Sequence, residues 1–116
     1  MEEQLTEGML NMLKKVETLL KEGRYSELSS ENSQSSLSTE EIENAILDYG
    51  GQITPAPESY FNQLTAIKIK GSQVAMWHID YDLWINGERS DLTVSLRLVS
   101  STNNDFGIIL TNIHIL

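Results

Sequence analysis

Residues 77–83 alternate strictly between apolar and polar side chains, and this run constrains the fold more than any other part of the chain. In a β-strand, successive side chains point to opposite faces of the sheet. The run therefore predicts a half-buried strand whose polar face carries His78, Asp80 and Asp82. Its apolar face would carry Trp77, Ile79, Tyr81, Leu83 and Ile85.

Two helices are expected before this strand. Apolar residues at helical spacing predict a first helix within residues 1–23, most regular from about residue 3 to 22, with Gly23 ending it in a left-handed conformation. Ser38 and Glu41 have the spacing of a capping box, which predicts a second helix over residues 39–50. The Ser-rich residues 24–38 between them are expected to form a flexible connection.

From residue 64 onward the apolar period changes to two, which indicates a sheet. Ile67 and Ile69 are expected to point inward, and Pro55 and Pro57 to hold an extended crossover into the first strand. The chain is thus expected to be one α+β domain over residues 1–116, with two N-terminal helices packed on one face of a four-stranded antiparallel meander. Its strands would span about residues 65–70, 74–85, 89–100 and 105–115.

The central hairpin allows two registers. A two-residue Asn86-Gly87 turn is favoured for a type I′ hairpin, but it places Asp82 opposite Asp91, and like charges directly opposed destabilise a sheet. A four-residue turn would instead place Asp82 opposite Thr93. The Asn-Gly pair favours the first register, so we expect a two-residue turn with a bulge near Asp91 that relieves the repulsion.

The last strand does not alternate cleanly. Ile109, Ile113 and Ile115 are expected on the core face, which would leave an apolar patch on the opposite face. Monomers rarely expose such a patch, so it would be a candidate surface for self-association. The patch would consist of Val99, Phe106, Ile108 and Leu110.

The chain carries a net charge of −9 and no cysteine. Residues 1–60 hold 12 acids and 4 bases, whereas residues 61–116 hold 5 acids and 4 bases. This balance argues against nucleic acid and anionic membranes as ligands, because phosphate binding needs a basic patch. It favours a basic protein partner, which an acidic surface attracts and steers.

No targeting signal is evident in the sequence. Residues 1–4 contain no basic segment, and no apolar run approaches the roughly 18 residues of a membrane span. The absence of cysteine removes disulfides, thiolate nucleophiles and cysteine zinc sites. We therefore expect a cytoplasmic protein without a cofactor.

The predicted polar strand face is the main candidate for chemistry. A histidine beside a carboxylate, such as His78 with Asp80, can act as a general base or a metal ligand. Side chains on neighbouring strands could join it. However, residues two apart on a flat strand converge poorly on a metal, so cross-strand polar pairs on an open sheet face are the simpler interpretation. The neighbours considered are Asp91, Thr93, Ser95, Arg97 and His114.

Trp84 and Arg89 lie close together across the predicted hairpin. They could form a cation–π contact, worth about 0.5–1 kcal/mol at an exposed site. Trp and Arg are also favoured anchors of protein interfaces, so the pair is equally a candidate partner contact.

Three motifs resemble a family of small uncharacterised bacterial proteins, from about residue 38 onward. They are the strand Asp80-Tyr81-Asp82-Leu83-Trp84, the strand Arg89-Ser90-Asp91-Leu92-Thr93 and the closing Ile113-His114-Ile115-Leu116. The order of elements is also similar to nuclear transport factor 2-like and cystatin-like folds, which host enzymes and binding modules alike. By size, acidity and lack of cysteine, the chain resembles immunity proteins of contact-dependent growth inhibition, which neutralise a toxin, often a basic nuclease.

The first functional hypothesis is a non-catalytic, bacterial immunity-type protein that occludes the active site of a basic toxin. Its contacts would come from the acidic helices and connection, including Glu27 and Glu31, or from the open sheet face. The alternatives are a small enzyme of the nuclear transport factor 2-like type and a homodimeric structural module. The expected partner-binding residues are Glu40, Glu41, Glu43, Asp80, Asp82, Trp84, Arg89 and Asp91.

Overall fold

A computed structural model describes residues 2–30, 37–71, 73–100 and 106–115. Within these ranges it shows an α+β fold with four helices and a six-stranded antiparallel sheet. The elements are β1 (Glu2–Gln4), α1 (Glu7–Lys21), α2 (Tyr25–Ser30), α3 (Thr39–Tyr49), β2 (Ile53–Thr54), α4 (Glu58–Phe61), β3 (Thr65–Lys68), β4 (Met76–Ile85), β5 (Glu88–Ser100) and β6 (Phe106–Ile115).

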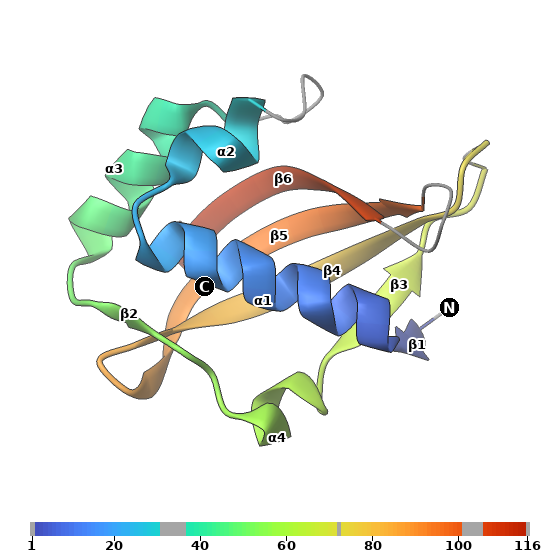
Figure 1. Cartoon of the computed structure of the whole chain (residues 1–116), viewed down its shortest axis with the longest axis horizontal. Helices are drawn as coiled ribbons and strands as arrows, with labels where there is room; N and C mark the ends of the chain where they lie inside the picture. Colours follow the sequence, from blue (N-terminus) through green and yellow to red (C-terminus); the bar gives the residue numbers. More distant parts are fainter. Residues whose placement is uncertain (1, 31–36, 72, 101–105, 116) are drawn as a thin grey trace.

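The helices α1, α2 and α3 lie together on one face of the sheet, with α1 running across it (Figure 1). The strands follow the order β1-β3-β4-β5-β6, and the short β2 pairs with the far end of β4. The opposite face of β4 and β5 is not covered by any of these helices (Figure 1), and we refer to it as the open face.

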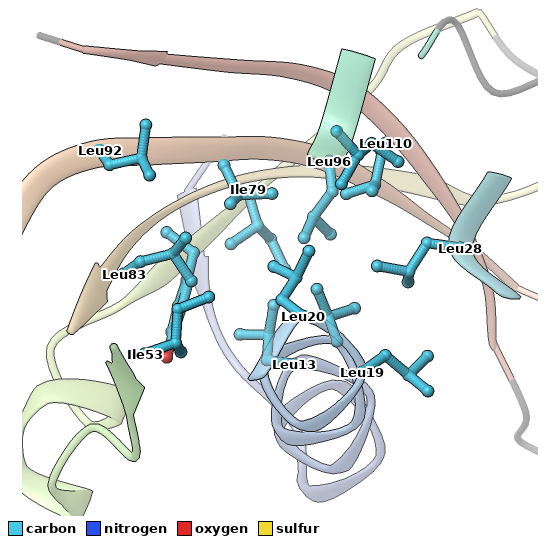
Figure 2. Close-up of a cluster of buried hydrophobic side chains, with 14 of the residues drawn as sticks. Leu13, Leu19, Leu20, Leu28, Ile53, Ile79, Leu83, Leu92, Leu96 and Leu110 are labelled. Carbon is cyan, nitrogen blue, oxygen red and sulfur yellow. The ribbon is translucent and has the colours of Figure 1, made fainter. Parts of the chain in front are cut away.

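The core fills the space between α1 and the sheet. Leu13 and Leu20 of α1 point toward Ile79 of the central strand β4, and Leu28 of α2 lies on the side of Leu110 (Figure 2). All of these residues form part of one cluster of buried side chains. Burial of this apolar area is the main contribution to the stability of the fold.

Both predicted helices are present, but their surroundings differ from the expectation. α1 begins later than predicted, because Thr6 caps it, and residues 2–4 form the strand β1 against β3 instead. The capping box of α3 is confirmed, with Ser38 Oγ accepting from the Glu41 amide at 3.1 Å. Gly23 follows α1 with a φ of 74°, as expected for a residue that ends a helix.

Two short helices were not predicted. α2 occupies the first part of the Ser-rich connection, so that the prediction of a flexible connection was wrong for Tyr25–Ser30. Glu31, which was expected to contact a partner, lies outside the described residues. α4 follows Pro57 and interrupts the expected extended crossover.

The central hairpin combines the two registers considered above. Asn86 and Gly87 have φ values of 54° and 81°, as a type I′ turn requires, and Trp84 lies opposite Arg89. Beyond an irregularity between Asp82 and Trp84, the register changes so that Asp82 lies opposite Thr93. The expected bulge is therefore confirmed, and Asp91 falls within it. The register set by the two-residue turn holds only between the turn and the bulge.

The predicted faces of β6 were wrong for its first half, which contains Phe106, Ile108, Ile109 and Leu110. In its second half, Ile113 and Ile115 lie opposite Val94 and Leu92 on the core face, as expected. A second irregularity, between Ser95 and Leu96 on β5, changes which side chains of β6 share a face. Leu96 lies opposite Leu110 and Leu98 opposite Ile108, so these residues of β6 face the helices. Leu110 is fully buried, and Phe106 and Ile108 pack against the core. Of the four residues expected to form an apolar patch, Val99 alone stays on the open face.

Ile109 of β6 and the apolar residues of β3 also lie on other faces of the sheet than predicted. Ile109 lies opposite Arg97, on the open face instead of the core face. On β3 the inward side chain is Ala66, which is fully buried, whereas Ile67 lies opposite His78 and is 43% exposed. The prediction placed the larger apolar residues Ile67 and Ile69 inward, whereas the small Ala66 occupies the inward position of β3.

Candidate functional site

The open face carries a polar cluster around Asp80. Ser95 Oγ donates to Asp80 Oδ1 at 2.6 Å, and His78 Nε2 lies 3.0 Å from the same oxygen. The carboxylate thus stands between the serine and the histidine. In a nucleophilic triad the histidine occupies the middle position and bonds to the serine. Asp80 and Ser95 lie directly opposite each other on β4 and β5, so their hydrogen bond is a cross-strand pair. Ser95 is also buried.

A second cluster forms around Asp82, one step along the same strand. Thr93 Oγ1 donates to Asp82 Oδ1 at 2.7 Å, while Arg89 Nε and Nη2 donate to Oδ2 at 2.9 and 2.7 Å. These hydrogen bonds raise the pKa of Arg89 above its usual value. The Asp82 side chain is only 14% exposed, against 60% for Asp80. Asp82 is therefore largely occupied by contacts within the sheet.

Tyr60 of α4 completes this cluster. Its hydroxyl accepts a hydrogen bond from the Asp82 amide at 2.8 Å, on the stretch of β4 that lies between its pairings with β2 and β3. The Arg89 guanidinium lies over the Tyr60 ring, 5.0 Å from the centroid. Trp84 meets the same ring edge-on at 5.9 Å. Tyr60, which the sequence did not single out, is thus the aromatic partner of Arg89.

Asp91 is separated from the open-face clusters. Its Oδ1 accepts a hydrogen bond from the Tyr49 hydroxyl of α3 at 2.7 Å, and this bond raises the pKa of Tyr49. His114 lies opposite Thr93, but its buried Nδ1 has no hydrogen-bond partner among the described residues. The structure therefore brings Asp80 and Asp82 together with their β5 neighbours and places Asp91 beside α3.

The acids of the helices also divide into two groups. Glu41 is engaged in the capping box, and Glu27 is paired with Arg24. In contrast, none of the ion pairs among the described residues involves Glu40, Glu43 or Asp48 of α3. We call these three residues the α3 acidic face.

A buried carboxylate was missed by sequence reasoning. Glu17 of α1 is 7% exposed, and its Oε2 accepts hydrogen bonds from the Tyr81 hydroxyl and, at 3.0 Å, from the Ala56 amide. Burial and the bond to Glu17 raise the pKa of Tyr81 far above its ordinary value. The signal was present in the sequence, because Glu17 follows Leu13 by four residues and precedes Leu20 by three on the apolar stripe.

Within the described ranges, no three histidine, aspartate or glutamate side chains gather in a way that could hold a metal ion. In the same part of the chain, no helix is long and apolar enough to cross a membrane.

Comparison with known proteins gives one match. A family model described as a domain of unknown function (DUF7668) matches residues 18–116. No curated protein and no solved structure matches the chain significantly. The matched region covers the sheet from β2 to β6, α2, α3, α4 and the last turn of α1. The chain therefore belongs to the DUF7668 family.

Proposed function

We propose that the chain is a non-catalytic binding protein of the immunity type, which neutralises a basic protein by contacting it through the α3 acidic face. The observation that carries this proposal is the set of acids at Glu40, Glu43 and Asp48, which have no ion-pair partner among the described residues. A surface of uncompensated charge attracts an oppositely charged protein and speeds its association.

An exposed apolar residue lies within this acidic face. Leu47 is 63% exposed and follows Glu43 by four residues and Glu40 by seven, so that the three share one side of the helix. A single exposed leucine needs no explanation by itself. Surrounded by acids, it has the composition of a small interface, with an apolar anchor and a polar rim.

The open face is less suited to this role. Asp80 and Asp82 already accept hydrogen bonds from Ser95, Thr93 and Arg89, and Arg89 compensates the charge of Asp82. A partner would have to break these bonds to use the carboxylates. We therefore place the contact on α3, with Asp91 at its border.

The mechanism would be attraction followed by occlusion. The acids of the α3 acidic face draw the basic partner in, and the folded domain then blocks its active site without any chemical step. The small-enzyme alternative would use His78, Asp80 or Asp82 as acid–base groups. It is less favoured because Asp80 accepts a hydrogen bond from Ser95, and Asp82 accepts hydrogen bonds from Thr93 and Arg89, within the sheet.

Affinity capture tests the proposal. The tagged protein should retain one basic protein from a native lysate at low salt and release it at high salt. The variant Glu40→Lys/Glu43→Lys/Asp48→Lys should lose this protein. The control Glu2→Lys/Glu7→Lys/Glu88→Lys changes the net charge equally and, through Glu7, also alters the first turn of a helix. It should retain the partner, and equal loss in both variants would overturn the assignment to α3.

A further inference from the structure

The two edges of the sheet differ in how they are protected. The edge strand β1 has three residues, and two of them are exposed glutamates. The other edge strand, β6, has ten residues with no charged residue and no proline. Natural sheets protect their edges with short strands, charges or prolines, because unpaired backbone groups bind other strands. Within the described residues, Asn112–Ile115 pair only with β5.

A hollow lies beside this end of β6. It has a volume of about 310 Å³, and its lining comes from α3 and from the sheet. Ile115, at its border, is 62% exposed. The hollow thus offers an apolar surface directly beside an edge that can accept a strand. Its lining residues are Ala45, Asp48, Tyr49, Leu92, Ile113, His114 and Ile115.

Two acids border the hollow. Asp48 lines it, and Asp91 is held next to it by the hydrogen bond from Tyr49. Asp48 belongs to no ion pair among the described residues, and neither does Asp91. An occupant of this site therefore needs apolar side chains for the hollow and positive charge for its rim.

We propose that this hollow receives an extended basic segment of the protein partner, which adds a strand to β6 at Asn112–Ile115. This inference rests on the proposed function and specifies the recognised segment. An extended chain alternates its side chains, so one set enters the hollow while backbone hydrogen bonds form along β6. Lysine or arginine side chains just beyond the inserted stretch then reach the rim of the hollow and pair with Asp48 and Asp91.

A second copy of this chain fits the site less well. A two-fold pairing of β6 with itself would bring the same surface of both copies together. Asp48 and Asp91 of each copy would then lie around one joint, and like charges at an interface oppose association. The charge of the rim thus favours a basic partner over self-association.

The test is a titration of the isotope-labelled full-length protein with the peptide amide Lys-Val-Lys-Val-Lys-Val, followed by NMR. Chemical shifts should change at residues 45–49 and 112–115, and amide exchange along the end of β6 should slow. The same peptide with alternate backbone amides methylated should bind at least tenfold more weakly, since it cannot form the ladder. A peptide with glutamate in place of lysine should not bind.

Charge variants refine the test. Asp48→Asn/Asp91→Asn should weaken peptide binding about tenfold, and asparagine at 91 still offers an oxygen to Tyr49. The control Glu2→Gln/Glu88→Gln removes two charges elsewhere and should bind normally. Equal binding of the methylated peptide, shifts confined to another surface, or shifts at β6 that depend on protein concentration without peptide would each overturn the proposal.

The outcomes also separate the two proposals. If charge reversal on α3 abolishes capture of the basic partner but the peptide does not bind β6, strand addition is wrong and the proposed function stands. If the peptide binds β6 but charge reversal on α3 does not reduce capture of the basic partner, the proposed function is wrong.

Discussion

Glu17 shows how one polar residue connects three parts of the fold. It lies on α1, bonds to Tyr81 on β4 and accepts from the Ala56 amide in the crossover between β2 and α4. A buried carboxylate needs such donors, because an unpaired charge in the interior is costly. The position of the crossover on the sheet therefore depends on Glu17, a polar residue that a search for apolar core residues would not identify.

Replacing Tyr81 with phenylalanine should destabilise the fold. The variant removes one of the two described donors to the buried Glu17 carboxylate, and an unsatisfied buried group costs about 1–3 kcal/mol. Chemical denaturation at neutral pH measures the loss. A variant as stable as the wild type would show that the bond between Tyr81 and Glu17 contributes nothing.

Tyr81 also makes the free energy of unfolding depend on pH in the alkaline range. The pKa of Tyr81 in the folded state is raised above the ordinary value of 10.0. The unfolded chain therefore releases this proton first as pH rises, so the stabilisation is complete below about pH 10 and declines above it. Each such tyrosine contributes a slope of up to about 1.4 kcal/mol per pH unit. Tyr81→Phe should reduce the measured slope by about that amount, and an unchanged slope would contradict the assignment.

At the scale of elements, Ser90 stabilises the bulge in β5. Its hydroxyl donates to the Leu83 carbonyl and accepts from the Leu92 amide at 3.2 Å. The bulge leaves backbone groups without ladder partners, and this side chain supplies them. The repulsion between Asp82 and Asp91 predicted the bulge, and Ser90 lies directly beside Asp91.

Ser90→Ala should therefore cost about 1–2 kcal/mol of unfolding free energy, because the Leu92 amide loses its acceptor in a partly buried position. The variant Ser59→Ala, at an exposed position of α4, serves as a control and should change stability by less than about 0.5 kcal/mol. Equal stability of the two variants, measured by thermal and chemical unfolding, would mean that the bulge does not depend on the Ser90 hydroxyl.

Gly51 fixes the approach of the α3–β2 connection to the central hairpin. Its φ is 81°, and a Cβ there would lie 2.5 Å from Ile85 Cγ2. Gly23 also has a positive φ, of 74°, but a Cβ there would meet nothing within 4 Å. Alanine at either position is strained, and only alanine at Gly51 also clashes with a neighbour.

Gly51→Ala should therefore be less stable than Gly23→Ala by about 1–3 kcal/mol, the usual cost of overpacking. The comparison cancels the cost of the left-handed backbone, which both variants share. Thermal unfolding of the two variants gives the difference. Equal stabilities would show that Ile85 moves away without cost.

The sequence predicted the elements whose signals are local. The capping box of α3, Gly23 after α1 and the Asn86-Gly87 turn are all confirmed, since neighbouring residues determine each of them. In contrast, β1 has no strand signal of its own and exists through its pairing with β3. Tyr60 could not be placed either, because its role depends on the gap that β2 and β3 leave along β4.

The faces of β6 show the limit of pattern reading. Apolar residues occupy both parities of this strand, with Ile108 and Leu110 on one and Ile109 on the other. A single irregularity opposite Ser95 and Leu96 decides which set is inward, and a shift of one residue moves every side chain to the other face. Periodicity does not locate such an irregularity.

At the scale of the whole molecule, the two faces of the sheet have different roles. The helix-covered face holds the core, and the open face holds the Asp80 and Asp82 clusters, whose hydrogen bonds join β4 to β5. Glu40, Glu43 and Asp48, which belong to no ion pair among the described residues, lie on α3, one of the helices that cover the sheet (Figure 1). Sequence composition predicted an acidic protein, but the division between paired and unpaired acids required the structure.

The most direct test of the proposed function is the rate at which the captured basic partner associates with the protein at different ionic strengths. The wild type should associate fast at low salt and much more slowly at high salt, since steering by charge raises on-rates by about 10–10³-fold. Glu40→Lys/Glu43→Lys/Asp48→Lys should associate at least tenfold more slowly and lose most of the salt dependence. Glu2→Lys/Glu7→Lys/Glu88→Lys should stay close to the wild type. Equal rates and equal salt dependence in the two variants would contradict the account.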